Sequence, residues 1–181
     1  MVIVFLADGF EELEAVACID LLRRAEVPTV VAGVGGTQIT GAHGLTITAD
    51  RAAEGMVPDD TLLGVVLPGG MPGTRNLEQD ETVHLFAETA FRQGKLLGAI
   101  CAAPSILGHM GLLDGLPAVC FPGFEQSLTK PLPDCAVCNH ENRIVTARGA
   151  GVAVEFALEL VAVLKGRNAA DAIKDAIQCR R

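Results

Sequence analysis

Short runs of aliphatic residues that end in tight turns constrain the fold of this chain more than any other feature. Each run is too short for an ordinary helix and is bounded by glycine, proline or charged residues. Continuous apolar runs are typical of strands buried on both faces, as in a parallel sheet covered by helices. The predicted strands are Val2–Ala7, Pro28–Val34, Gly64–Leu67, Lys95–Ile100 and Arg143–Ala147, with a further short, alternating strand at Leu45–Thr48.

Segments with helical periodicity separate these strands. They are Glu11–Arg24, Glu81–Gln93, Pro104–Gly111, Val152–Leu164 and Ala169–Gln178. The alternation predicts right-handed βαβ units and an α/β fold, a doubly wound parallel sheet sandwiched by helices. Hydrophobic residues make up 50% of the chain but aromatics only 4%, so the core should be aliphatic. We expect one domain over residues 1–181, with the least defined pattern at Phe121–Asn142.

Charge and composition exclude several classes of partner. The formal net charge of −8 argues against binding to nucleic acid or to an anionic membrane surface. Asp8 and Glu11 follow the first strand at once, unlike a secretory signal, and no apolar stretch reaches the ~18 residues of a membrane span. The six cysteines are too sparse for a disulfide scaffold, so we expect free thiols in a reducing cytoplasm. The glycines around Arg148 form no dinucleotide fingerprint, and no cofactor is predicted.

Cys101 lies where a predicted strand turns into a helix, with Pro104 in the first helical turn. In such folds ligands bind beyond the carboxyl ends of the strands, so the turns Ala7–Phe10, Pro68–Gly73 and Cys101–Pro104 should meet at one site. Free N–H groups and a helix dipole at that turn would favour a reactive thiolate. The alternative is a buried, inert cysteine, which is common for this residue type. The sequence thus predicts a nucleophile elbow at Cys101.

Glu14 falls inside the apolar stripe of the first predicted helix, whereas Glu12 lies outside it. The stripe comprises Phe10, Leu13, Ala17, Cys18 and Leu21. Burial raises the pKa of a carboxyl group, and a nearby thiolate raises it further. A protonated Glu14 could then share one proton with Cys101. Alternatively, Glu14 merely flanks the core and reaches solvent.

Gly69 and Gly70 follow a buried strand, where paired glycines allow a sharp turn with exposed N–H groups. The N–H of Gly70, together with that of Ala102, could hold an oxyanion formed at an attacked carbonyl. Taken alone, a strand followed by Pro-Gly-Gly is usually only a turn.

Other candidate residues carry weaker signals. Cys135, Cys138 and His140 resemble half a zinc site, but no second pair of ligands has a matching spacing, so no metal is predicted. Cys120 could be a resolving thiol near Cys101 or could fill the core. Arg148, which ends a strand before a helix, could bind an anion or anchor that helix.

Four motifs, in order along the chain, resemble the ThiJ/PfpI superfamily and are closest to its YajL-like bacterial branch. They are Ala7–Glu14, Leu67–Gly70, Ala99–Pro104 and Thr146–Gly151. The resemblance implies a flavodoxin-like α/β sandwich that is usually a homodimer. It also implies a reactive Cys101, a partner carboxylate at Glu14, backbone donors at Gly70 and Ala102, and an anion-facing arginine at Arg148.

The chain departs from parts of this pattern. Protease-like members have a histidine directly after the cysteine, where this chain has Ala102. Phe121 replaces another histidine found in some relatives, and His43 stands where others carry an arginine from the opposite subunit. No histidine is positioned to complete a Cys-His triad, which argues against a cysteine peptidase.

The resemblance implies a cofactor-independent enzyme acting on reactive carbonyls in stress protection, of the glyoxalase III or protein deglycase type. Its substrate would be a small dicarbonyl or a glycated adduct. The alternative is an oxidation-sensing, redox-regulated chaperone in which peroxide converts Cys101 to a sulfinate. The superfamily name suggests thiamin biosynthesis, but the sequence contains no phosphate-binding loop, which argues against that role.

Overall fold

A seven-stranded sheet forms the centre of this structure, a computed structural model that describes residues 1–179. In spatial order its strands are β10 (Val137–His140), β11 (Ile144–Ala147), β7 (Leu96–Ile100), β6 (Gly64–Leu67), β1 (Val2–Leu6), β2 (Thr29–Gly33) and β5 (Arg51–Ala52). All neighbouring strands are parallel except the β10–β11 pair. The carboxyl ends of β1, β6, β7 and β11 therefore lie along one edge of the sheet.

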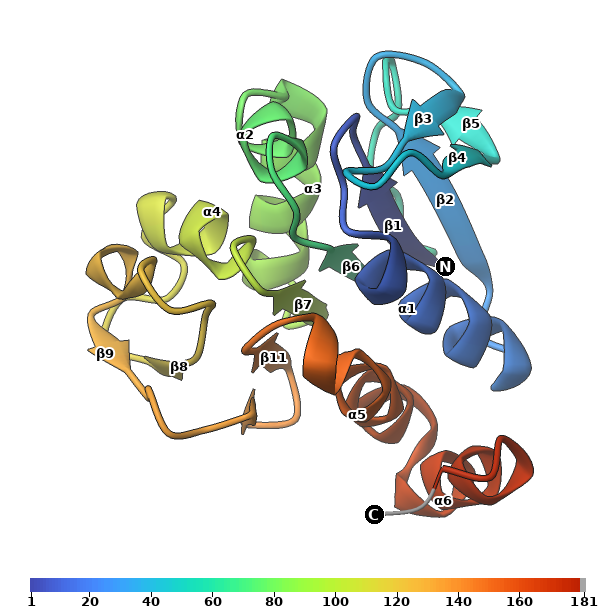
Figure 1. Cartoon of the computed structure of the whole chain (residues 1–181), viewed down its shortest axis with the longest axis vertical. Coiled ribbons are helices and arrows are strands. Elements are labelled where there is room, and N and C mark those ends of the chain that lie inside the picture. Colours follow the sequence, from blue (N-terminus) through green and yellow to red (C-terminus); the bar gives the residue numbers. More distant parts are fainter. Residues whose placement is uncertain (180–181) are drawn as a thin grey trace.

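Helices cover both faces of the sheet (Figure 1). One layer contains α1 (Glu12–Arg24), α5 (Ala153–Lys165) and α6 (Arg167–Ala176). The other contains α2 (Gly73–Glu78), α3 (Glu81–Arg92) and α4 (Pro104–His109). The predicted α/β fold, with a mainly parallel sheet between helices, is confirmed.

The alternation of side chains along β1 explains its uninterrupted apolar sequence. Val2, Val4 and Leu6 belong to the core beneath α1 and α5, whereas Ile3 and Phe5 belong to the core beneath α3. Because both faces of the strand are covered, every position must be apolar.

Smaller elements complete the fold. β3 (Gln38–Thr40) and β4 (Thr46–Thr48) form an antiparallel hairpin, and β8 (Pro117–Ala118) pairs in parallel with β9 (Lys130–Pro131). Single 3-10 turns lie at η1 (Glu125–Ser127) and η2 (Ala150–Val152). Within residues 1–179, no helix combines the length and apolar character needed to cross a membrane.

The elements that the sequence did not predict are short or lie at edges of the sheet. They are α2, β3, β5, β8, β9 and β10. The last of these lies within Phe121–Asn142 and is mostly half-buried, so it lacks the continuous apolar run of a central strand. Because β10 is antiparallel to β11, the sheet is mixed rather than wholly parallel.

Candidate active site

The three predicted turns meet at the carboxyl edge of the sheet. The Glu11 N–H donates to the Gly69 carbonyl at 2.9 Å, which joins the turn after β1 to the turn after β6. A Cβ placed on Gly69 would lie 2.6 Å from the Cβ of Cys101, so the turn after β7 is equally close. The expected convergence is confirmed.

Cys101 occupies a sharp strand-to-helix turn, as predicted. Its φ of 64° lies in the left-handed region, which is uncommon for a residue with a side chain and costs about 1–3 kcal/mol. Two hydrogen bonds hold this conformation: the Cys101 N–H donates to the Ala147 carbonyl at 2.9 Å, and the Phe121 N–H donates to the Cys101 carbonyl at 2.7 Å. The surrounding backbone therefore fixes the direction of the sulfur.

Glu14 is fully buried at this site, with 0% of its surface exposed. Its Oε2 accepts a hydrogen bond from the Gly69 N–H at 2.7 Å, while Oε1 is buried and has no hydrogen-bond partner among the described residues. Burial raises the pKa of Glu14 to about 7, with a smaller contribution from the charge of Glu11. A carboxyl group with this pKa can take up or release a proton at neutral pH.

The thiol of Cys101 and the carboxyl group of Glu14 act on each other. Burial raises the pKa of Cys101 to about 12, and the charge and hydrogen bonding of Glu14 add to this effect. The N–H groups of Ala102 and Gly70 act in the opposite direction, which places both predicted backbone donors at the sulfur. The structure thus brings together Cys101, Glu14, Gly69, Gly70 and Ala102.

The surroundings of the sulfur act against the predicted stabilised thiolate, which stays a prediction. Helix α4 begins only at Pro104 and has six residues, so its dipole is short, whereas burial and the Glu14 charge both oppose a second negative charge. Together these effects raise the pKa of Cys101 and favour its thiol form. The carboxyl group of Glu14 is the neighbouring acceptor for its proton.

The buried face of α1 differs from the predicted stripe. Leu13 is 65% exposed and Ala17 is half-buried, whereas Glu12 is buried. The helix begins at Glu12 and is capped by Glu11, whose Oε2 accepts from the Glu14 N–H at 2.8 Å. The buried face comprises Glu12, Glu14, Ala15, Cys18, Leu21 and Leu22.

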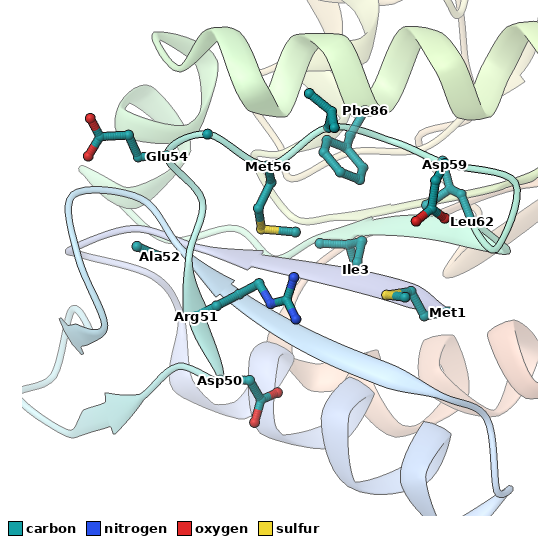
Figure 2. A pocket seen from close by; sticks show the side chains of 12 residues that line it. Met1, Ile3, Asp50, Arg51, Ala52, Glu54, Met56, Asp59, Leu62 and Phe86 are labelled. Atoms are coloured by element: carbon teal, nitrogen blue, oxygen red, sulfur yellow. The ribbon is translucent and has the colours of Figure 1, made fainter.

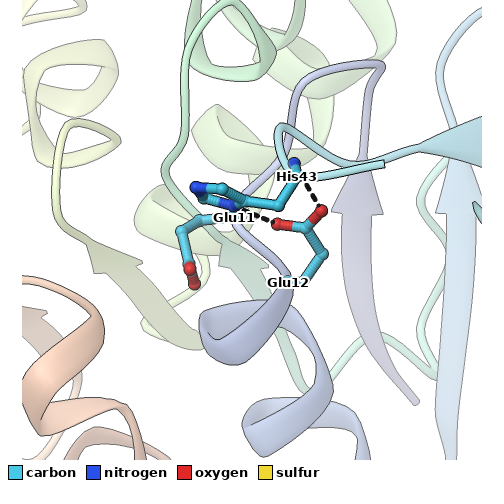
Figure 3. A group of neighbouring side chains, drawn as sticks. All are labelled: Glu11, Glu12 and His43. Carbon is cyan, nitrogen blue, oxygen red and sulfur yellow. Dashed lines mark hydrogen bonds and ion pairs between the residues drawn. The ribbon is translucent and has the colours of Figure 1, made fainter. Parts of the chain in front are cut away.

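The burial of Glu12 has a specific cause, a pair of contacts with His43 in the β3–β4 loop (Figure 3). One oxygen of Glu12 accepts from the His43 N–H at 2.6 Å, and the other lies 2.8 Å from Nδ1 of its ring. Burial acts to raise the pKa of Glu12, but the hydrogen bonds with His43 outweigh burial, so the pKa of Glu12 is lowered. The same contact raises the pKa of His43. The contact ties the loop to the start of α1. No sequence signal pairs residues so far apart in the chain.

Glu11, Glu12 and His43 are the one group of three possible metal ligands in residues 1–179. Both oxygens of Glu12 already bind His43, and Glu11 is engaged as the helix cap. Their hydrogen-bonding capacity is thus largely used within the protein.

The weaker candidates are engaged in hydrogen bonds within the protein or fill the core. The guanidinium of Arg148 donates to the Pro133 carbonyl at 2.7 Å, so it anchors the neighbouring loop. Cys120 is buried in the core beneath α3 and α4, which matches its core-filling alternative. The thiols of Cys135 and Cys138 donate to separate carbonyls, those of Val137 and Pro117.

A cavity of about 600 Å³ lies elsewhere, beside β5 on the α3 face of the sheet (Figure 2). Ile3, Met56 and Phe86 form its apolar wall, and the side chain of Arg51 extends into it. None of the residues gathered around Cys101 lines this cavity.

Substitution of Gly69 with alanine should disrupt the site. The new Cβ would lie 2.6 Å from Cys101 Cβ and 2.9 Å from Glu14 Oε2, so we expect a loss of about 1–3 kcal/mol in the free energy of unfolding. Urea denaturation measures the loss. Gly151→Ala is the matched control, because nothing lies within 4 Å of its added Cβ. Equal stability of the two variants would contradict tight packing at Gly69.

Comparisons with known proteins identify relatives of this chain. The chain is 35% identical over 187 residues to the Arabidopsis thaliana protein DJ-1 homolog A, covering 99% of this chain but 46% of that protein. It therefore spans less than half the length of that relative. It is 31% identical over 160 residues to the Caenorhabditis elegans glutathione-independent glyoxalase DJR-1.2, covering 86% of this chain and 83% of that one.

A solved structure of oxidized Toxoplasma gondii DJ-1 superimposes with a TM-score of 0.91 at 35% identity, covering 98% of this chain and 97% of the other. The sequence profile of the DJ-1/PfpI family matches residues 1–163. The elbow cysteine and its buried carboxylate partner thus lie within the part of the chain that matches the family. This chain belongs to the DJ-1/PfpI family.

Proposed function

We propose that this protein is a cofactor-independent enzyme that acts on reactive dicarbonyls, or on glycated adducts derived from them, in protection against stress. The observation that carries the proposal is the buried Glu14, whose pKa is raised by burial to about 7 and whose carboxyl group interacts with the Cys101 thiol. A similar protein is named a glutathione-independent glyoxalase, which supports the same class of reaction.

The proposed reaction starts with addition of the thiol to the aldehyde of methylglyoxal. As the S–C bond forms, Glu14 takes the thiol proton and passes it to the carbonyl oxygen, which gives a hemithioacetal. The N–H groups of Gly70 and Ala102 stabilise the negative charge that develops on this oxygen.

Glu14 then removes the proton from the former aldehyde carbon and returns it to the adjacent carbon, and the hydroxyl proton of the first carbon passes to the oxygen of the second. The first carbon is oxidised and the second is reduced, so no external oxidant is needed, and the product is a lactoyl thioester of Cys101. Water hydrolyses this thioester, releasing lactate and restoring the thiol. Glyoxal gives glycolate by the same steps.

The direct test is incubation of the purified protein with methylglyoxal in the absence of glutathione and other thiols. We expect lactate to form in proportion to protein concentration, as followed by proton NMR. A wild-type preparation that is folded by circular dichroism but forms no lactate would overturn the proposal.

A second candidate function is oxidation sensing coupled to chaperone activity. It is favoured by the structure of a 35% identical relative that is described as oxidized. Two equivalents of peroxide would convert the Cys101 thiol to a sulfinic acid and release two waters. Peptide mass spectrometry after mild peroxide treatment should then find two added oxygens at Cys101. Oxidation scattered over several cysteines would contradict a sensor.

The protein is further proposed to be a homodimer located in a reducing cytoplasm. All six cysteines are free thiols, and α1 presents a strongly exposed apolar face beside Glu14. Leu13 and Val16 are 65% and 48% exposed on this helix, and Leu45 in the adjoining loop is 63% exposed. A second copy of the chain would remove these side chains from water.

Substitution of Val16 with aspartate should convert the dimer to a monomer, because a charge would be buried without a partner. Light scattering during size-exclusion chromatography measures the mass. Leu85→Asp is the matched control, since Leu85 is 41% exposed on α3 in the opposite helix layer. A wild-type protein that is monomeric at micromolar concentration would disprove this assembly.

A further inference from the structure

Phe121 is unusual among the phenylalanines of this chain. Its side chain is 47% exposed, whereas the other six are buried or half-buried. An exposed aromatic ring is costly in water, and such rings often serve in binding. The location of this ring is therefore informative.

The backbone of Phe121 is tied directly to the nucleophile. Its N–H donates to the Cys101 carbonyl at 2.7 Å, so the two residues keep a fixed relation. A Cβ placed on Gly149 would lie 3.2 Å from Cδ2 of the Phe121 ring and 3.9 Å from Sγ of Cys101. Ring and sulfur thus both lie close to the position that a side chain of residue 149 would take, and glycine leaves that position without one.

Arg148, the residue directly before Gly149, does not change the apolar character of the surface that the Phe121 ring forms. Arg148 is exposed, and its guanidinium is turned to the Pro133 carbonyl, 2.7 Å away. A molecule that reaches the sulfur past Gly149 therefore meets an aromatic face on one side. The polar donors, the N–H groups of Gly70 and Ala102, lie at the sulfur itself.

We infer that Phe121 is a specificity-determining residue that makes this site prefer 2-oxoaldehydes with an apolar alkyl or aryl substituent. The inference rests on the proposed function and names its substrate class. The aldehyde carbon binds at the sulfur, and the substituent on the second carbonyl packs against the ring. Glyoxal has only a hydrogen at that position and gains nothing from this contact.

The activity test compares phenylglyoxal with glyoxal. We expect the ratio of their kcat/KM values to fall about 3- to 10-fold in Phe121→Ala, the range typical of an aromatic contact. Phe121→Leu should lose less, because it keeps an apolar side chain and preserves folding. Leu85→Ala, which removes an exposed apolar side chain from α3, should leave the ratio unchanged.

A second readout does not need dicarbonyl turnover. Cys101 is alkylated with N-benzylmaleimide and with N-methylmaleimide, and the two rates are measured at the Cys101 peptide by mass spectrometry. Taking their ratio cancels changes in thiol pKa, and this ratio should also fall about 3- to 10-fold in Phe121→Ala.

The two readouts separate the possible failures. If the wild type turns over no dicarbonyl but the alkylation ratio falls in Phe121→Ala, the proposed function is wrong, and the contact of Phe121 with apolar substituents at Cys101 is confirmed. If Phe121→Ala and Phe121→Leu leave the alkylation ratio at the wild-type value, the inference is wrong whatever the activity.

Discussion

Replacement of Cys101 with serine should abolish lactate formation from methylglyoxal, lowering kcat/KM by about three orders of magnitude or more. A serine hydroxyl has nearly the same size but is a far weaker nucleophile when its only base is a carboxylate with a pKa of about 7. The hemithioacetal, on which every later step depends, would not form. The rate of lactate formation, followed by NMR at a protein concentration high enough to detect residual activity, measures the loss.

The matched control is Cys135→Ser, which removes a half-buried thiol whose hydrogen bond goes to the Val137 carbonyl. This variant should keep the wild-type rate. If Cys101→Ser retains the rate, or if Cys135→Ser loses it, the nucleophile has been assigned to the wrong sulfur.

Substitution of Glu14 with glutamine should lower kcat/KM by about 10²- to 10⁴-fold, the usual contribution of a positioned acid–base group. Glutamine can still accept the Gly69 hydrogen bond, but it cannot take the thiol proton. Because the carboxylate is the active form, the wild-type rate should rise with pH through about 7 and then level off. The variant should lack this rise, and a variant with an unchanged pH profile would assign the base elsewhere.

The same substitution should stabilise the protein above neutral pH. Burial raises the folded-state pKa of Glu14 from 4.5 to about 7, so the folded protein holds a proton that the unfolded chain releases. The stability contributed by this group is complete below pH 4.5 and is lost as pH rises to about 7.

Relative to the wild type, Glu14→Gln should therefore gain up to about 3 kcal/mol in unfolding free energy between pH 4.5 and pH 8. Urea denaturation at the two pH values gives the difference, which cancels titrations common to both proteins. A constant difference between the two proteins would mean that Glu14 titrates normally.

Together these expectations describe a site that sacrifices stability for chemistry. A buried carboxylate without a full set of partners and a cysteine in the left-handed region both destabilise the fold. Both occur where the proposed reaction needs them. Replacing Glu14 with glutamine, or Cys101 with glycine, which tolerates the left-handed region, should therefore lower activity while raising stability.

The order of the central strands and of the main helices along the chain was predictable from the sequence, and so was the choice of Cys101 and Glu14 as candidate site residues. Central strands such as β1 are buried on both faces and so must be apolar throughout, which leaves a local signal. Glu14 was found because a carboxylate in a helical stripe is unexpected, even though Leu13 of that stripe is exposed. These signals arise from neighbouring residues or from helical periodicity.

Other features depend on contacts between distant segments, and only the tertiary structure decided them. Glu12 and His43 bind each other although they lie 31 residues apart in the chain. Gly149 becomes informative only because Phe121 and Cys101 lie close to it in space. The pKa of Cys101 likewise depends mainly on burial and on Glu14, and less on the N–H groups of the local turn. Desolvation and charge–charge effects depend on distance in space, whereas sequence patterns report distance along the chain.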